Sequence, residues 1–342
     1  MNEFRHGGAG PQQATGDDKP DSMRTLGFGC ASLFGLPSKR DRRAVLEAAY
    51  GCGIRHFDVA PMYGLGLAER ELAEFIGTRT DVIVATKFGI RPTRAGRAAG
   101  RIQPPVRHLM RSFPAVKSTV KRSGSKRDAG LVGRILYSDH DYSVANARRA
   151  LVASLRTLGV GRINYFLLHE PARMLQANYP ELVEFLDSEV RRGTIEHWGP
   201  AGELADADDN LSGLISRAPA LQIPYDLING HAGPHGGPER PTIVFGFISA
   251  TLPRVAAALA TDPQFRQQCG ELLDVDLRDQ RALVHLLVRN AVTHNRFGTV
   301  LLSSTDRNHL QAICAAACVP LPNEAEVARM IRQKCLDTRV ER

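Results

Sequence analysis

The chain has 342 residues, of which 43% are hydrophobic, so it is long enough to bury the core of one large domain or two smaller ones. It has no run of about eighteen apolar residues and no N-terminal segment of the signal-peptide type, so we expect neither a membrane span nor export. The formal net charge is +8, and residues 91–134 account for it: their twelve Lys and Arg and one acidic residue give +11, which leaves −3 for the remaining chain.

The first part of the chain predicts alternating strands and helices after a disordered tail. Residues 1–22 are rich in Gly, Gln, Asp and Pro and have almost no apolar side chains, which is typical of disorder. Ser38 is a suitable N-cap for the first helix. The predicted elements are a strand at 24–31, a helix that follows Ser38 and ends at Gly51 and Gly53, a strand at 54–58, a helix at 69–76 and a strand at 82–86.

Residues 90–137 interrupt this alternation with prolines, glycines and spaced arginines and show few regular apolar patterns. An insertion of this length inside a compact domain is usually functional or mobile, and we interpret it as a basic flap or lid. The alternative is a contact with a phosphorylated substrate or an acidic partner. We do not expect nucleic-acid binding, because the segment has neither interleaved aromatic residues nor a known motif.

Regular patterns resume at Ser143 and continue towards the C-terminus. The predicted elements are a helix at 143–158, a strand at 163–169, a helix at 181–192, a strand at 194–199, a short helix at 211–217, strands at 220–227 and 242–249, a helix at 281–294, a strand at 299–304, a helix to residue 318 and a last helix at 323–335. In the last helix, Val327, Met330, Ile331 and Cys335 recur at helical spacing and should face the domain core.

These patterns predict an α/β fold of the (β/α)8 barrel class. Eight strand-like runs are counted, and most are continuously apolar and followed by a helix, which is typical of parallel strands covered on both faces. No GxGxxG sequence stands between a strand and a helix, which disfavours a doubly wound dinucleotide-binding sheet. The predicted organisation is a barrel over 23–318, with 90–137 as its basic insertion, and a C-terminal helix and tail over 319–342.

The cysteines and the loop histidines predict neither disulfides nor a metal site. None of the six cysteines forms a CxxC pair, and Cys314 and Cys318 lie one helical turn apart on an alanine-rich segment, as buried free thiols do. A reducing cytoplasm is the simplest compartment for such a chain. His231 and His235 lie in a polar loop without a third ligand, so no metal is expected there.

Three predicted strands carry a polar residue at their carboxyl ends, namely Asp58, Lys87 and His169, and Tyr63 follows Asp58 by five residues. In a parallel barrel these ends meet at one mouth, where active sites lie. A phenol is a poor acid at neutral pH, and an ammonium such as that of Lys87 lowers its pKa, while a carboxylate holds the ammonium charged. The four groups therefore predict a proton donor for a carbonyl oxygen, with the hydride coming from a nicotinamide, since no side chain supplies one.

The same residues resemble the motifs of the aldo-keto reductases. The similar segments are FDVAPMYGLGLAE with Asp58 and Tyr63, VIVATKFG with Lys87 and YFLLHEP with His169, in the family's order, and the resemblance extends from about residue 26 to about residue 316. It implies a (β/α)8 barrel that binds a nicotinamide cofactor without a Rossmann fold. It also implies that Tyr63 is the general acid, that Lys87 and Asp58 tune it, and that His169 orients the carbonyl.

The resemblance is less complete on the cofactor side. Where the family commonly has Ser-Asn after strand five, this chain has Ala201 and Gly202, and Ile248 stands where a tyrosine often stacks on the nicotinamide. NADP is the implied cofactor and NAD is the alternative, because Asp306 is unfavourable beside a 2′-phosphate. The residues expected at the cofactor are Gly29, Gln222 beside the nicotinamide, Ser249, and Ser303, Ser304, Arg307 and His309 around the adenosine phosphate.

The resemblance predicts an NAD(P)-dependent oxidoreductase that reduces an aldehyde or ketone, or oxidises the corresponding alcohol or lactol. A small-molecule carbonyl or alcohol is the expected partner, without nucleic acid or membrane. The alternative is a non-catalytic barrel that binds a nucleotide and acts as a sensor or scaffold through its basic insertion. The four retained catalytic residues favour the enzyme.

Overall fold

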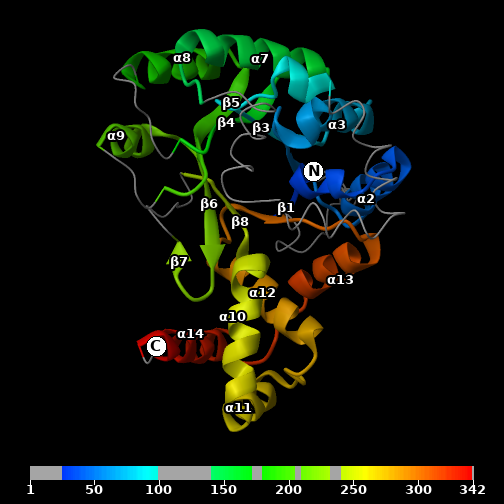
Figure 1. The fold of residues 1–342 in the computed structure, drawn as a ribbon, viewed down its shortest axis with the longest axis vertical. Helices are drawn as coiled ribbons and strands as arrows, with labels where there is room; N and C mark the ends of the chain where they lie inside the picture. The colour runs from blue at the N-terminus through cyan, green and yellow to red at the C-terminus, as the bar shows by residue number, and fades with distance from the viewer. Residues whose placement is uncertain (1–24, 99–139, 172–178, 205–208, 232–239, 341–342) are drawn as a thin grey trace, which may run out of the picture.

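The computed structural model describes residues 25–98, 140–171, 179–204, 209–231 and 240–340 (Figure 1). The predicted N-terminal tail at 1–22 and most of the basic insertion lie outside the described residues. The division of the chain into tail, barrel with insertion and C-terminal part therefore stays a prediction.

Eight parallel strands form a closed barrel, which confirms the predicted fold class. Each strand pairs with its neighbour in the chain, β1 pairs with β9, and β5 pairs with β6 through Ala201 and Gln222. A short β7 (Gly230–His231) runs antiparallel to β6 outside this ring. The barrel strands are β1 (Leu26–Gly29), β2 (His56–Asp58), β3 (Ile83–Phe88), β4 (Ile163–His169), β5 (Ile195–Ala201), β6 (Leu221–Asp226), β8 (Thr242–Phe245) and β9 (Thr299–Leu302).

Helices follow the strands and cover the barrel (Figure 1). Ser38 caps the first of them as predicted, since its hydroxyl accepts the N–H of Asp41, and Ser143 caps another by accepting the N–H of Asn146. The helices are α2 (Lys39–Gly51), α3 (Ala68–Ile76), α7 (Val144–Leu158), α8 (Tyr179–Arg191), α9 (Asp209–Arg217), α10 (Phe247–Thr261), α11 (Pro263–Leu273), α12 (Gln280–His294), α13 (Arg307–Cys318) and α14 (Glu324–Val340), with short 3-10 turns η1 (Cys30–Gly35) and η2 (Tyr63–Gly66).

Two apolar layers hold the barrel. Strand side chains alternate between its two faces, so Phe57 packs outward under the helices and its neighbour Asp58 points inward. The inner layer is a separate buried cluster of Leu167, Ala201, Ile243 and Leu301. This cluster fills the middle of the barrel and forms the floor below the ends of the strands.

The prediction of a strand over 242–249 is wrong at its C-terminal half. Strand β8 ends at Phe245, Gly246 has a φ of 80°, and α10 begins at Phe247. The left-handed backbone of Gly246 turns the chain from strand to helix, although the sequence stays apolar across the turn. The sequence pattern also predicts no element between 250 and 280, where most of α10 and all of α11 lie.

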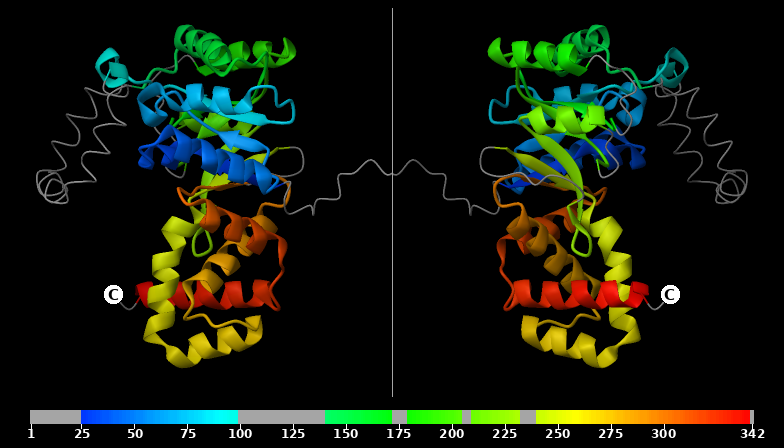
Figure 2. Two further views of the ribbon diagram at one scale, coloured as in Figure 1. Left: turned by 90° about the vertical axis from the view of Figure 1, so that its right-hand side faces the viewer. Right: turned by 90° about the vertical axis from the view of Figure 1, so that its left-hand side faces the viewer.

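Helices α10, α11, α12 and α14 form a layer of their own at one end of the molecule (Figure 2). As predicted, Val327, Ile331 and Cys335 of α14 are buried and Met330 is partly buried against the core. None of the described helices is both long and apolar enough to cross a membrane.

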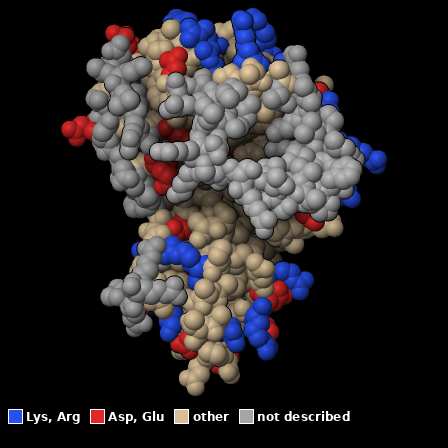
Figure 3. Space-filling view, viewed as in Figure 1, with Lys and Arg blue, Asp and Glu red and all other residues tan. Residues whose placement is uncertain are grey.

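Ion pairs join this layer, and charged side chains of both signs lie intermixed over it (Figure 3). Arg289 of α12 contacts Glu324 of α14 at 2.9 Å, and Lys334 of α14 contacts Asp262 at 2.7 Å. The cysteines are all free thiols, with Cys314 buried and Cys318 half-buried.

Candidate active site

Asp58 and Lys87 form a buried ion pair inside the barrel mouth. The Lys87 Nζ donates to Asp58 Oδ1 at 2.6 Å and to the carbonyl oxygen of Val59 at 3.2 Å. Only 3% of the Lys87 side chain and 4% of the Asp58 side chain are exposed. Because one residue ends β2 and the other lies near the end of the adjacent β3, the parallel register fixes the pair on rigid strands.

Tyr63 lies over this pair and beside His169. Its ring centroid is 5.1 Å from the Lys87 Nζ and 5.7 Å from the His169 ring, which it meets edge-on. The η2 turn that carries Tyr63 continues through Gly64 with a φ of 59°, and a Cβ on Gly64 would lie 2.5 Å from the Phe34 ring. The close packing of Phe34 on this glycine holds the turn, and with it the phenol, against the barrel mouth.

Opposing effects set the pKa values of Tyr63 and Lys87. Burial raises the pKa of the Tyr63 phenol, and the nearby Lys87 ammonium only partly offsets this rise. Burial also works to lower the pKa of Lys87, but the charges of Asp58 and Tyr63 outweigh it and leave that pKa raised. The expected net lowering of the Tyr63 pKa is therefore wrong, because burial outweighs the ammonium. Tyr63 is a neutral phenol beside a charged lysine at neutral pH.

His169 is a buried neutral imidazole at the end of β4. Burial, with smaller contributions from Lys87 and His140, lowers its pKa from 6.5 to about 3. Its Nδ1 is buried and has no hydrogen-bond partner among the described residues. Its carbonyl oxygen accepts a 2.5 Å hydrogen bond from the Tyr142 hydroxyl, which fixes the backbone of this strand end.

The four predicted catalytic residues line one cavity of about 250 Å³ at the carboxyl ends of the strands. Three of the predicted cofactor residues, Gly29, Gln222 and Ser303, line it as well. The complete described lining is Gly29, Ala31, Asp58, Tyr63, Lys87, His169, Glu170, Ala201, Gly202, Gln222, Phe245, Gly246, Leu301 and Ser303.

The side-chain amide of Gln222 forms a hydrogen bond with the second carboxylate oxygen of Asp58. Its Nε2 donates to Asp58 Oδ2 at 2.9 Å, while Lys87 occupies Oδ1. Both carboxylate oxygens are thus satisfied without water, which holds the Asp58 charge in a barrel interior that would otherwise penalise it. The amide oxygen of Gln222 is left as an acceptor on the cavity side.

The other predicted cofactor residues lie outside this cavity. Ser249 lies exposed in the first turn of α10 and donates to the carbonyl oxygen of Gly246. A second cavity of about 370 Å³ lies between α2 and the start of α13 and is lined by Arg307 but not by His309 or Ser304. In this position Asp306 caps α13 by accepting the N–H groups of Asn308 and His309.

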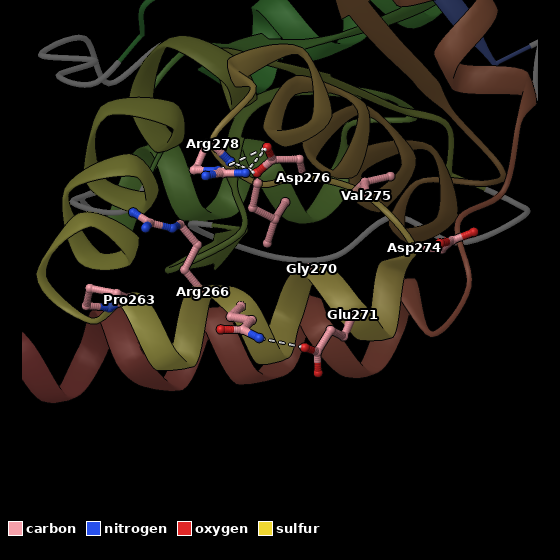
Figure 4. A pocket seen from close by; sticks show the side chains of 10 residues that line it. Pro263, Arg266, Gly270, Glu271, Asp274, Val275, Asp276 and Arg278 are labelled. Atoms are coloured by element: carbon pink, nitrogen blue, oxygen red, sulfur yellow. Dashed lines mark hydrogen bonds and ion pairs between the residues drawn. The ribbon is translucent and has the colours of Figure 1, made fainter.

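A larger cavity of about 640 Å³ lies beside α11, away from these groups (Figure 4). Its polar side chains largely satisfy one another, since Arg278 pairs with Asp276 and Gln267 donates to Glu271. The described residues that line it include neither a nucleophile nor a buried titratable group. The cavity at the strand ends is therefore the candidate active site.

The sequence model of the Aldo/keto reductase family matches residues 25–229, which is 205 of the 342 residues. The chain belongs to the aldo/keto reductase family. Members of this family are oxidoreductases that act on aldehydes and alcohols, and the matched range contains Asp58, Tyr63, Lys87 and His169.

Two curated relatives each match less than half of this aldo/keto reductase. It is 33% identical over 159 residues to the D-threo-aldose 1-dehydrogenase of a Pseudomonas species, which covers 44% of this chain and 41% of the relative. It is 32% identical over 164 residues to the pyridoxal 4-dehydrogenase of Microbacterium luteolum, which covers 47% of this chain and 43% of the relative. The match thus spans less than half the length of these relatives.

Solved aldo/keto reductases share the fold over most of the chain. The glycerol dehydrogenase of Gluconobacter oxydans superimposes with a TM-score of 0.58 at 16% identity and covers 93% of both chains. An aldo-keto reductase of Klebsiella pneumoniae in complex with NADPH gives a TM-score of 0.51 at 18% identity and covers 90% of this chain and 91% of its own.

Sequence reasoning missed two residues of this site. Tyr142 gave no signal, because it stands alone between the insertion and the helix that begins at Val144. Glu170 directly follows His169 in the LLHEP segment, so its position in the sequence already put it at the barrel mouth. Its carboxylate takes no part in the predicted proton transfer, so the motif alone does not indicate a function for it.

Proposed function

We propose that the protein is an NAD(P)-linked oxidoreductase that interconverts a carbonyl compound with its alcohol or lactol, using Tyr63 as the general acid and base. One observation carries this proposal: Tyr63, Lys87, Asp58 and His169 line a single cavity at the carboxyl ends of the barrel strands. A phenol, an ammonium, a carboxylate and a neutral imidazole together suit proton transfer to a carbonyl oxygen.

The cavity fits a nicotinamide nucleotide through main-chain groups and Gln222. Gly29 and Gly246 line it without side chains, and a Cβ on Gly246 would meet no atom within 4 Å, so a ligand can approach the backbone there. The free amide oxygen of Gln222 suits a carboxamide N–H. A bound nicotinamide would supply or accept the hydride at the reacting carbon. The NADPH bound to the Klebsiella relative supports this assignment.

In the reductive direction, the Tyr63 phenol donates its proton to the carbonyl oxygen as that oxygen gains charge. The Lys87 ammonium stabilises the resulting phenolate, and Asp58 holds Lys87 in its charged form. His169 stays neutral at working pH and donates its ring N–H to the same oxygen, which orients the carbonyl. In the oxidative direction the phenolate takes the proton back.

The raised pKa of Tyr63 gives this mechanism a pH signature. A neutral phenol is the form that reduction needs, so the reductive rate should persist through neutral pH and fall as pH rises through the pKa of Tyr63. Oxidation needs the phenolate and should rise over the same range. The aldose named in one relative bears a lactol at carbon 1 in its ring form, which supports a lactol as the oxidative substrate.

The test is a Tyr63→Phe variant. Nicotinamide fluorescence during titration with NADPH and with NADH gives the cofactor affinity, and a panel of aldehydes and lactols gives the turnover. We expect Tyr63→Phe to lower turnover by about 10²–10⁴-fold at unchanged cofactor affinity, because only the proton donor is lost.

A matched Tyr50→Phe variant, which removes the surface hydroxyl that donates to Asp81, should keep wild-type turnover. A Tyr63→Phe variant as active as wild type would refute the assignment. Cofactor binding without turnover of any substrate would support the sensor alternative.

A further inference from the structure

One acidic side chain lines the cavity without a part in the proton transfer. Glu170 directly follows His169 and is exposed at the mouth. The negative charge of Glu170 acts on Tyr142: burial and, to a smaller extent, this charge raise the pKa of the Tyr142 phenol. The Tyr142 hydroxyl in turn donates a hydrogen bond to the carbonyl oxygen of His169. The carboxylate therefore acts at the cavity that His169 also lines, near the Tyr142 hydroxyl that fixes the backbone of His169.

The charge of Glu170 has no counterpart in the described part of the site. No hydrogen bond or ion pair of its carboxylate is found among the described residues. The other two charged groups of the cavity, Asp58 and Lys87, neutralise each other at 2.6 Å, and His169 is neutral. Among the described residues of the cavity lining, Glu170 is therefore the one acceptor whose negative charge is not balanced.

The backbone holds Glu170 rigidly and at a conformational cost. Its φ is 53°, in the left-handed region that a residue with a long side chain rarely adopts. Its N–H donates to the carbonyl oxygen of Ala201 at 2.6 Å, and a Cβ on Gly202 would lie only 3.1 Å from its Cα. Strained residues that the surrounding structure fixes in this way cluster at active sites and ligand contacts.

We infer that Glu170 determines substrate specificity by accepting hydrogen bonds from the hydroxyl groups of a polyhydroxylated aldehyde or lactol. A carboxylate has only acceptors, and its hydrogen bonds to hydroxyls are stronger than those between neutral groups. The same charge disfavours substrates that carry a carboxylate or phosphate near the reacting carbon. This inference rests on the proposed function and narrows its substrate class.

The test compares three substrates in wild type and in Glu170→Gln: an aldopyranose, benzaldehyde and 4-carboxybenzaldehyde. We expect Glu170→Gln to lower kcat/KM for the sugar about tenfold, chiefly through KM, to leave benzaldehyde unchanged and to raise kcat/KM for the carboxylated aldehyde. Glu181→Gln, which removes an exposed carboxylate from α8, is the matched control and should change none of the ratios.

A Glu170→Gly variant controls for loss of activity through misfolding, since glycine adopts the left-handed backbone of this position without strain. It should fold at least as stably as wild type and lose sugar preference more completely than Glu170→Gln. Unchanged ratios in both variants would overturn the inference. Calorimetry of sugar-lactone binding to the cofactor-loaded protein tests the role of Glu170 separately from the proposed function. An affinity about tenfold lower in Glu170→Gln than in wild type supports that role even if wild type turns over no substrate. Equal affinities overturn it.

Discussion

At the residue scale, the two buried charges of the barrel interior, Asp58 and Lys87, are held by hydrogen bonds to each other and to neighbouring groups. Lys87 and Gln222 satisfy both oxygens of Asp58, and Val59 accepts a further hydrogen bond from Lys87. Removing one partner of such a pair leaves a buried charge uncompensated, which typically destabilises a protein by about 3–5 kcal/mol. The site therefore depends on Gln222 for the position of Asp58 as well as for any contact with the cofactor.

A buried histidine should make the barrel sensitive to acid. Burial, aided by the charge of Lys87, lowers the pKa of His56 from 6.5 to about 3, and its Nε2 has no hydrogen-bond partner among the described residues. A histidine with a lowered folded-state pKa stabilises the fold fully above pH ~6.5, and this contribution is lost as pH falls towards 3. At pH 5 the loss is about 2 kcal/mol for this residue.

A His56→Gln variant isolates this effect. Urea unfolding at pH 7 and pH 5 gives the change in the free energy of unfolding, and that change should be about 2 kcal/mol smaller in the variant than in wild type. The comparison of the two proteins removes the contribution of Glu69, whose raised pKa acts in the opposite direction. Equal pH dependence in both proteins would show that His56 does not titrate as the structure implies.

Among the site residues, those that stand at the end of a strand within a known motif could be predicted from the sequence. Asp58, Lys87 and His169 could be placed because three apolar runs lead directly to them, and the cavity contains all three. The net direction of the Tyr63 pKa could not be read, because it depends on how much burial opposes Lys87. The bond from Gln222 to Asp58 crosses the barrel between residues 164 positions apart and leaves no local pattern.

At the element scale, the start of α13 bears on the choice of cofactor. The Asp306 carboxylate accepts the N–H groups of Asn308 and His309, so two of the donors at this helix end are already occupied. Its negative charge opposes a phosphate at the same place, whereas Arg307 and Arg40, which line the adjacent cavity, favour one. We expect the charge of Asp306 to weaken the preference for NADPH over NADH.

An Asp306→Ser variant should test this effect, because serine keeps the cap and removes the charge. The affinity for NADPH relative to NADH should rise about threefold to tenfold, with little change in stability. Asp279→Ser removes the same charge from the N-cap of α12 and should leave the affinity ratio unchanged. An equal effect of both variants would mean that net charge, and not the position of Asp306, controls the ratio.

Element boundaries were predictable where glycine or a cap marks them within a periodic pattern. Ser38 and Ser143 cap helices as expected. The stretch after Phe245 was misassigned, because the apolar run continues through Gly246 and α10 also contains Pro253. A short apolar run does not distinguish a strand from a buried helix, and here only the left-handed turn at Gly246 separates the two.

At the scale of the whole molecule, closure of the barrel depends on the approach of β5 to β6. The two strands share the pair Ala201 and Gln222, and the N–H of Ala220 bonds the carbonyl oxygen of Trp198. Gly199 allows this approach, since a Cβ there would lie 1.8 Å from the carbonyl oxygen of Ala220. The carbonyl oxygen of Ala220 lies directly before β6 and cannot move aside without separating β6 from β5.

A Gly199→Ala variant should therefore be destabilised by about 1–3 kcal/mol or more and should lose activity together with stability. Gly51→Ala is the matched control, because a Cβ at Gly51 meets no atom within 4 Å near the end of α2, and it should be neutral or slightly stabilising. Thermal unfolding followed by circular dichroism measures both. A Gly199→Ala protein as stable as Gly51→Ala would contradict this account of barrel closure.

We propose that the side chains at the barrel mouth assist hydride transfer between a nicotinamide and a carbonyl carbon. The most direct measurement uses NADPH and NADH deuterated at the transferring position of C4, with mass spectrometry of the alcohol formed in a single turnover. We predict one deuterium on the former carbonyl carbon with wild type and a rate about 10²–10⁴-fold lower with Tyr63→Phe. Product without deuterium, or equal rates for the two proteins, would contradict the account.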